Sequence, residues 1–191
     1  MKIGLFFGSF NPIHVGHLII ANFMATQTDL QQVWLIVSPH NPLKMKNSLA
    51  RDHDRLHWVQ TAVADNPRLR ASDVEFKLDK PSYTIDTLRV LNKKFPQHEF
   101  ALIMGGDNLA TLQKWKDYET ILSDYAIYVY KRPRYELGAL ESHPQVRAFD
   151  APSMDISATF IRQCVAQGKS IQYLVPAAIQ EEVEIILKKT V

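Results

Sequence analysis

The chain has 191 residues, 46% of them hydrophobic and 22% charged, a composition typical of a globular domain with a sizeable apolar core. Its formal net charge of +2 is too small to favour a nucleic acid or an acidic membrane as partner. A single cysteine, Cys164, excludes an intrachain disulfide and a cysteine-rich metal site, which fits a cytoplasmic location. Without a signal-peptide pattern or an apolar run of about 18 residues, we expect one domain over residues 1–191.

Short apolar runs alternate with longer amphipathic stretches, which predicts an α/β fold with a doubly wound, mainly parallel sheet. The predicted strands, each an apolar or β-branched run, are residues 2–7, 32–37, 100–104 and 125–130, with shorter candidates at 68–71 and 147–149. The predicted helices are residues 17–26, 50–64, 84–94, 108–113, 118–122, 157–167 and 176–188. Proline and polar residues indicate loops at 38–47, 79–82 and 131–144.

The first predicted strand runs into a loop of small residues that leads to a helix start. Gly8 and Gly16 allow the backbone to approach a ligand closely, and the free N–H groups at a helix start favour an anion. His14 and His17 are three residues apart, so both imidazoles can face the same side. We therefore expect a polyphosphate site in which both histidines stabilise transition-state charge. A helical histidine pair can also bind zinc, but the sequence indicates no third ligand.

Ligands of doubly wound sheets bind beyond the carboxyl ends of the strands. Four segments with polar, basic or glycine residues follow predicted strands there, at 8–17, 38–44, 105–107 and 131–132. Their convergence on one edge predicts a single active site. The first loop matches neither a Walker P-loop nor a GxGxxG fingerprint, which argues against a kinase or a dinucleotide-dependent dehydrogenase.

A second helix start near the end of the chain has the features of an anion site. Ser157 is a good N-cap, and Arg162 can add a charge-assisted hydrogen bond to a phosphate held there. Taken alone, residues 156–162 are explained equally well by an ordinary capped surface helix.

These segments resemble a known family. His14-Val15-Gly16-His17 is similar to the (H/T)xGH signature of the nucleotidyltransferase superfamily, and residues 156–162 are similar to its second signature. Residues 80–88 resemble the SYT-x-x-TL motif of bacterial nicotinate mononucleotide adenylyltransferases, and 105–109 and 115–122 resemble that family too. The resemblance covers essentially the whole chain. It implies a Rossmann-like fold and transfer of AMP from ATP to nicotinate mononucleotide, with Mg²⁺ held mainly by the ATP phosphates.

The resemblance also implies the roles of single residues. The implied catalytic residues are His14, His17, Lys44 and Arg162. The implied ATP and phosphate ligands are Gly8, Ser9, Phe10, Gly16, Gly105, Asp107, Arg132, Ile156, Ser157 and Thr159. The implied mononucleotide ligands are Ser82, Tyr83, Thr84, Asp107, Trp115 and Tyr118.

Within the mononucleotide set, the resemblance implies that Thr84 and its backbone hold the nicotinate carboxylate at a helix start. Trp115 would stack on the cationic pyridine ring, Tyr118 would complete that pocket, and Asp107 would bond ribose hydroxyls. The residue types alone leave plainer roles open. Trp115 and Tyr118 also suit packing positions, and Lys44 and Arg132 also suit solvated surface charges.

One stretch departs from the family pattern. Where the family commonly has a Pro-Pro-His-Lys-like sequence, residues 38–44 read Ser-Pro-His-Asn-Pro-Leu-Lys, so Leu43 stands at the histidine position and His40 lies elsewhere.

Two alternative functions stay open. One is the same chemistry on nicotinamide mononucleotide or phosphopantetheine, and the other is a nucleotide-binding sensor without turnover. The sequence does not indicate an oligomeric state.

Overall fold

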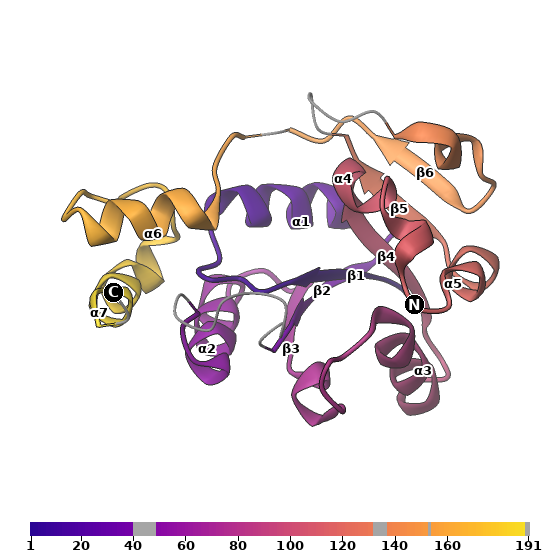
Figure 1. Ribbon diagram of the computed structural model, residues 1–191, viewed down its shortest axis with the longest axis horizontal. Helices are drawn as coiled ribbons and strands as arrows, with labels where there is room; N and C mark the ends of the chain where they lie inside the picture. Colours follow the sequence, from indigo (N-terminus) through magenta and orange to yellow (C-terminus); the bar gives the residue numbers. More distant parts are fainter. Residues whose placement is uncertain (40–48, 132–136, 153, 190–191) are drawn as a thin grey trace.

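The computed structural model describes residues 1–39, 49–131, 137–152 and 154–189 (Figure 1). Its centre is a six-stranded sheet in the order β3-β2-β1-β4-β5-β6, and every neighbouring pair is parallel. The strands are β1 (Lys2–Gly8), β2 (Gln32–Val37), β3 (Leu69–Ser72), β4 (Glu99–Gly105), β5 (Ile127–Tyr130) and β6 (Val146–Phe149). All six predicted strands and the doubly wound parallel sheet are thus confirmed.

The central strands form because their side chains are apolar on both faces. In β1, Leu5 is fully buried and pairs in register with Trp34 of β2 and Leu102 of β4. The strand order changes direction between β1 and β4, and the carboxyl ends of such a pair leave a crevice for a ligand.

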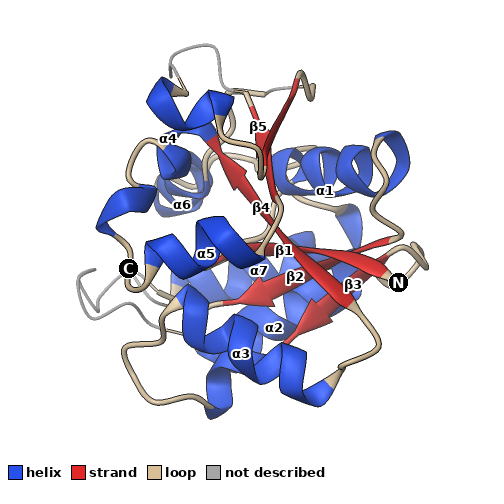
Figure 2. Ribbon diagram, turned by 90° about the vertical axis from the view of Figure 1, so that its right-hand side faces the viewer, coloured by secondary structure: helices blue, strands red, loops and turns tan. Residues whose placement is uncertain are grey.

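Helices cover both faces of the sheet (Figure 2). They are α1 (Val15–Gln27), α2 (Asp52–Ala62), α3 (Thr84–Lys94), α4 (Gly106–Leu109), α5 (Tyr118–Asp124), α6 (Ala158–Ala166) and α7 (Gln180–Lys188). Buried residues of α1, α2, α6 and α7 share one core cluster, whereas those of α3, α4 and α5 share a second cluster. In Figure 1, α6 and α7 lie together at the end of the molecule opposite the N-terminus.

Short 3₁₀ helices account for the differences from the predicted helices. The predicted helix at 108–113 is divided between α4 and η3 (Leu112–Lys114), because Lys114 N–H bonds to the carbonyl three residues back at Thr111. The C-terminal helix begins with η5 (Ala177–Ile179) instead of regular α-helix. Further 3₁₀ turns, η2 (Val74–Lys77) and η4 (Gly138–Ser142), lie where the sequence predicted no helix.

Within the described part of the chain, none of the helices has the length and apolar character needed to span a bilayer.

Candidate functional site

A cavity of about 620 Å³ opens at the carboxyl end of the sheet. Its walls come from the end of β1 with the loop into α1, from α4 and the end of β5, and from residues 151–152 and 154–158 at the start of α6. The predicted site residues that line it are Gly8, Ser9, Phe10, His14, Gly16, His17, Ile156 and Ser157. The first and last signatures of the chain, about 140 residues apart in sequence, therefore face one cavity.

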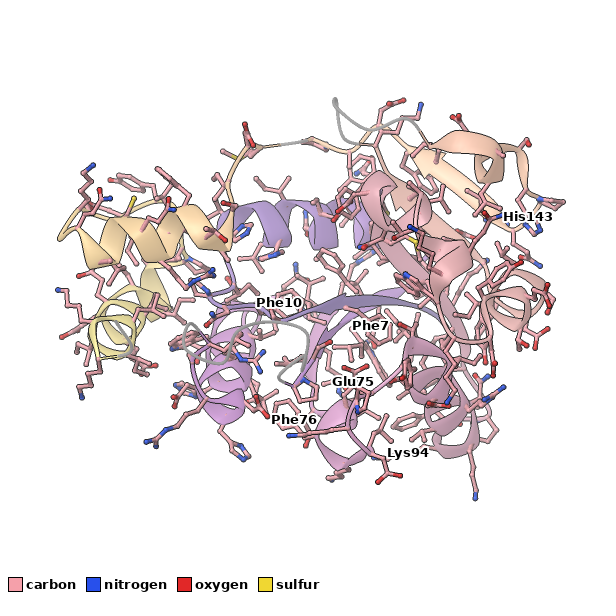
Figure 3. All side chains as sticks on the ribbon, viewed as in Figure 1. Phe7, Phe10, Glu75, Phe76, Lys94 and His143 are labelled. Carbon is pink, nitrogen blue, oxygen red and sulfur yellow. The ribbon has the colours of Figure 1, made fainter. Side chains whose placement is uncertain are left out.

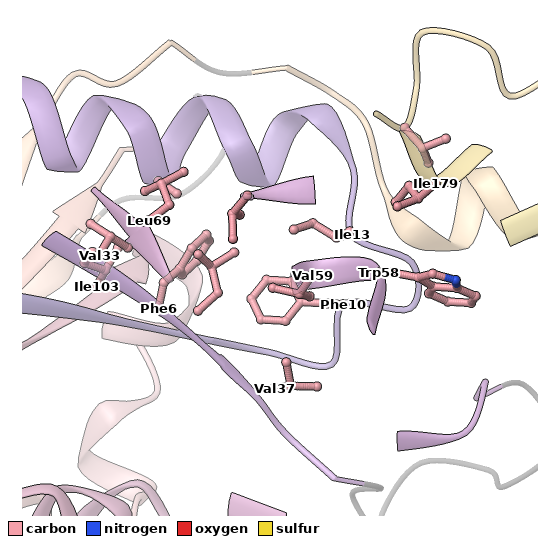
Figure 4. Packing of buried hydrophobic residues seen from close by; sticks show 14 of the residues in the cluster. Phe6, Phe10, Ile13, Val33, Val37, Trp58, Val59, Leu69, Ile103 and Ile179 are labelled. Atoms are coloured by element: carbon pink, nitrogen blue, oxygen red, sulfur yellow. The ribbon is translucent and has the colours of Figure 1, made fainter. Parts of the chain in front are cut away.

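The β1–α1 loop is shaped around Phe10. Its backbone has a φ of 44°, in the left-handed region that bulky residues seldom occupy, and its side chain is buried in the first core cluster (Figure 4). The ring covers Gly8, where an added Cβ would lie 2.9 Å from a ring carbon. It also meets the His17 ring edge-on, with centroids 5.1 Å apart. Phe10 therefore acts as a rigid support for His17.

His14 and His17 lie side by side, as the spacing predicts. Their rings are stacked with centroids 3.6 Å apart and an interplanar angle of 27°. The backbone N–H of His14, the residue that precedes α1, donates a hydrogen bond of 3.2 Å to Nδ1 of His17. Because Nδ1 accepts this bond, the neutral ring carries its hydrogen on Nε2. His17 is therefore oriented as a hydrogen-bond donor, the property that a phosphate oxygen requires.

The start of α6 is capped by Ser157, whose hydroxyl oxygen accepts the backbone N–H of Phe160 at 3.1 Å. One turn later, Arg162 donates from Nη1 to the carbonyl of Asn11 at 2.8 Å and from Nη2 to Thr159 Oγ1 at 3.1 Å. Burial lowers the pKa of Arg162, although an arginine stays protonated at neutral pH. Neither Arg162 nor Thr159 is part of the cavity lining, and Arg162 joins α6 to the β1–α1 loop.

A backbone hydrogen bond adds a second connection to this loop. Val15 N–H, at the start of α1, donates to the carbonyl of Leu174 at 3.0 Å. The start of α1 is therefore held by segments from the far end of the sequence.

The carboxylate of Asp107 folds back toward the end of β4, and Asp107 is not among the residues that line the cavity. A Cβ on Gly105 would lie 2.4 Å from Oδ1 of Asp107, so only glycine lets this carboxylate fold back over the strand end. The neighbouring Asn108 lines the cavity. No group of three or more histidines, cysteines, aspartates or glutamates able to hold a metal ion occurs among the described residues.

The predicted mononucleotide residues gather in a second region, around the start of α3. Lys116 donates to Asp86 of α3 at 2.8 Å, and its ammonium lies 4.8 Å from the centroid of the Tyr83 ring. Arg89 of α3 pairs with Asp117 at 2.9 Å. These contacts join two segments that lie about 30 residues apart in the sequence.

Trp115 and Tyr118 stand beside these contacts and pack, partly buried, against the second core cluster. The described residues Ser82, Tyr83, Thr84, Trp115 and Tyr118 are not part of the lining of the 620 Å³ cavity. We call the cavity wall at the histidines, predicted to bind phosphates, the phosphate region, and the surroundings of the start of α3, predicted to bind the acceptor, the acceptor region. Asp107 follows β4, away from the start of α3 in the sequence.

Lys44 and Arg132, together with His40 and Leu43, lie outside the described residues.

Sequence reasoning missed Arg55, which is fully buried on α2. Its guanidinium donates to the carbonyl oxygens of Ser9, Ser38 and Ala50, the last two at 2.8 and 3.2 Å, and it pairs with Asp52 at 2.6 Å. Burial lowers the pKa of Arg55, while the bond to Asp52 opposes that shift. Arg55 thus connects the loops that follow β1 and β2. The cavity lining also includes Asn11, Asn108 and Tyr130, which were not among the predicted site residues, although Asn11 and Asn108 lie within predicted motif segments.

Comparison with known proteins shows the family of the chain. The sequence model of the cytidylyltransferase-like family matches residues 5–164. The chain is 56% identical over 181 residues to a probable nicotinate-nucleotide adenylyltransferase from Cytophaga hutchinsonii, covering 95% of this chain and 94% of that protein. It is 53% identical over 186 residues to a protein of the same description from Flavobacterium johnsoniae, covering 96% of each.

Solved structures show the same fold. The nicotinic acid mononucleotide adenylyltransferase of Plasmodium falciparum complexed with NaAD superposes with a TM-score of 0.81 at 17% identity, covering 100% of this chain and 98% of that one. A putative nicotinate-nucleotide adenylyltransferase from Vibrio parahaemolyticus superposes with a TM-score of 0.71 at 21% identity, covering 95% and 97% of the two chains.

Proposed function

Since the chain belongs to the cytidylyltransferase-like family, and within it to the nicotinate-nucleotide adenylyltransferases, we propose that it transfers the AMP of ATP to nicotinate mononucleotide. The products are nicotinate adenine dinucleotide and pyrophosphate. The observation that carries the proposal is the meeting of His14, His17 and the Ser157 helix start around one cavity. We also propose that residues 1–191 act as one nucleotidyltransferase domain in the cytoplasm, on small-molecule substrates.

In this reaction a phosphate oxygen of the mononucleotide attacks the α-phosphorus of ATP in line. The new P–O bond forms as the bond from the α-phosphorus to the bridging oxygen breaks, and the electron pair leaves with pyrophosphate. The attacking phosphate is already an anion at neutral pH, so the step needs neither a strong general base nor a covalent intermediate. The task of the protein is therefore to position both substrates and to stabilise charge.

The phosphate region is suited to that task. His17 presents an Nε2–H donor because its Nδ1 is occupied by the His14 backbone, and the stacked His14 adds a second imidazole. The Ser157 helix start offers backbone N–H groups and a positive dipole end. In this proposal both histidines stabilise charge in the transition state, Arg162 and Lys44 assist, and Gly8, Ser9, Phe10 and Gly16 shape the ATP site.

The acceptor region is suited to a carboxylated pyridine. The N–H groups at the start of α3, at Thr84, favour a carboxylate. Trp115 and Tyr118 offer aromatic surface to the pyridinium ring, and the Lys116 contacts hold the two segments together. In this proposal Ser82 and Tyr83 shape the pocket and Asp107 bonds the ribose hydroxyls.

Nucleotidyltransferases generally use Mg²⁺ together with ATP, and the donor set here fits an ion held mainly by substrate. Asp107, next to the cavity-lining Asn108, would offer a carboxylate to such an ion. Mg²⁺ commonly binds in this way, through few carboxylates and several substrate phosphate oxygens. Bound there, Mg²⁺ would supply positive charge that stabilises the pyrophosphate leaving group.

A coupled pyrophosphate-release assay tests the proposal, with ATP, Mg²⁺ and one acceptor at a time. We expect nicotinate mononucleotide to give the highest kcat/KM, because donors placed for a carboxylate lose their anion when the amide binds. A preference for nicotinamide mononucleotide or phosphopantetheine would contradict the assigned acceptor. Silence with all three acceptors would favour a nucleotide-binding sensor instead.

A further inference from the structure

Glu75 is a buried carboxylate that the reaction does not use. It lies on η2, has 3% of its surface exposed, and points into the interior between the sheet and η2 (Figure 3). Thr87 donates a hydrogen bond of 2.8 Å to Oε1, and Ser82 donates one of 3.3 Å to Oε2. The hydroxyl of Ser38 is a third hydrogen-bond partner. Burial raises the pKa of Glu75, and the three hydroxyls oppose that shift by stabilising the charged form.

The three hydroxyls come from separate segments around the acceptor region. Ser82 immediately precedes Tyr83 and Thr84, and Thr87 lies in the first turn of α3, so both belong to the stretch proposed to hold the mononucleotide. Ser38 follows the last residue of β2. One carboxylate therefore fixes how the start of α3 stands relative to the end of β2.

Ser38 in turn connects this region to the phosphate region. Its backbone N–H donates to the Gly8 carbonyl at 2.9 Å, and its carbonyl accepts from Arg55 at 2.8 Å. Arg55 also bonds the Ser9 carbonyl. A continuous set of hydrogen bonds thus runs from the loop after β1, through Arg55 and Ser38, to Glu75 and α3.

From this arrangement we infer that Glu75 is a positioning residue for the acceptor: it sets the orientation of the start of α3 and thereby the affinity for the mononucleotide. The inference rests on the proposed function. A buried carboxylate is tolerated only while donors surround it, so its three hydroxyl partners are held in one geometry. An apolar side chain of the same size would fill the space without orienting Ser82 or Thr87.

The test is a set of steady-state measurements on Glu75→Gln. An amide keeps the shape of the carboxylate, but only its oxygen can accept a hydrogen bond. Its NH₂ group is a donor, so it would face a hydroxyl that donates to Glu75 in the parent protein. We expect KM for nicotinate mononucleotide to rise about tenfold, the consequence of leaving one buried partner unsatisfied. KM for ATP should stay within about twofold, because the phosphate region keeps its own contacts.

The control is Glu99→Gln, the same chemical change at an exposed carboxylate that pairs with Lys2 at 3.3 Å at the amino end of the sheet. Neither KM should change in this variant. A second pair of variants is independent of how well Glu75→Gln folds. Thr87→Val removes the hydroxyl and should raise KM for the mononucleotide, whereas Thr87→Ser keeps it and should restore the parent value.

Each outcome has a clear reading. A selective rise in KM for the mononucleotide, with rescue by Thr87→Ser, supports the inference. Equal rises in both KM values, or an unchanged KM for the mononucleotide in Glu75→Gln and Thr87→Val, overturn it and leave the proposed function standing. An unmodified protein that releases no pyrophosphate with nicotinate mononucleotide overturns the proposed function, and this inference with it.

Discussion

The two ends of the central sheet use charged side chains in opposite ways. At the amino end, charges pair with one another near the surface: Asp29 lies 3.0 Å from Lys2 and 3.2 Å from Arg147, and it accepts a hydrogen bond from Tyr128. The Tyr128 hydroxyl and the two cations hold the pKa of Asp29 at about 2, although partial burial acts in the other direction.

At the carboxyl end, the key side chains bond instead to the backbone of the loops that they hold. Arg55 donates to three carbonyls, Arg162 donates to the Asn11 carbonyl, and His17 accepts the His14 N–H. Side chains that bond to the backbone determine the shape of a loop, whereas exposed ion pairs add little more than modest stability. This difference separates the end proposed to bind substrates from the opposite end of the sheet.

Arg55→Met should show the largest difference between the two ends. It leaves the carbonyls of Ser9, Ser38 and Ala50 without their buried donor, so the free energy of unfolding should fall by about 3–5 kcal/mol. The matched control is Arg147→Met, whose half-exposed side chain should cost less than about 1 kcal/mol. Urea unfolding of both variants measures the difference. Equal losses would mean that the two ends do not differ in this respect.

His17→Ala tests the chemistry of the carboxyl end directly. Loss of an oriented donor to developing phosphate charge should lower kcat by about 10²-fold, which corresponds to about 2.7 kcal/mol. The free energy of unfolding should fall by only about 1 kcal/mol, for the lost acceptor of the His14 N–H. His57→Ala, at an exposed histidine of α2 that pairs with Glu182, is the control and should keep the parent kcat. A near-normal kcat in His17→Ala would remove His17 from the proposed catalytic residues.

Substitutions of Ser157 separate its role as a cap from its role at the phosphate. Ser157→Ala removes the acceptor for the Phe160 N–H and should lower the free energy of unfolding by about 1 kcal/mol. Ser157→Asp keeps a capping oxygen and should unfold like the parent, but its negative charge should raise KM for ATP. A parent-like KM in Ser157→Asp would place the phosphates away from the start of α6.

Asp29→Asn should change the free energy of unfolding least among these variants, and it should leave kcat unchanged. The folded-state pKa of about 2 lies below the ordinary value of 3.8, so the contribution of Asp29 is complete above about pH 4 and is lost as the pH falls toward 2. Because the side chain is half exposed, we expect less than about 1 kcal/mol at pH 7. Urea midpoints at pH 7 and pH 3 should differ less in the variant than in the parent. An equal pH dependence would show that Asp29 does not contribute in this way.

The sequence predicted the strands and the phosphate loop because both are local. A buried parallel strand is a continuous apolar run, and the glycines and histidines of the phosphate loop lie within ten consecutive residues, 8–17. The implied roles of the site residues, Lys44 and Arg132 among them, stay predictions.

The supports behind the site were not predictable in the same way. Arg55 and Glu75 look in sequence like surface charges on amphipathic segments, and their partners lie up to 46 residues away or on backbone carbonyls. No periodic pattern encodes a bond from a guanidinium to a carbonyl, so only the packed fold identifies these residues. The 3₁₀ helix η4 lies within a stretch whose proline and polar residues predicted a loop, because five residues are too few to give a periodic pattern.

The bonds from Arg162 to Asn11 and from Val15 to Leu174 have a consequence for protein synthesis. The β1–α1 loop is translated before α6, and two of the groups that hold its backbone, Arg162 and the Leu174 carbonyl, follow it by about 150 residues. At roughly 5–20 residues per second, that delay is about 8–30 s. A nascent chain therefore carries both histidines for some seconds before these two supports of the loop have been made.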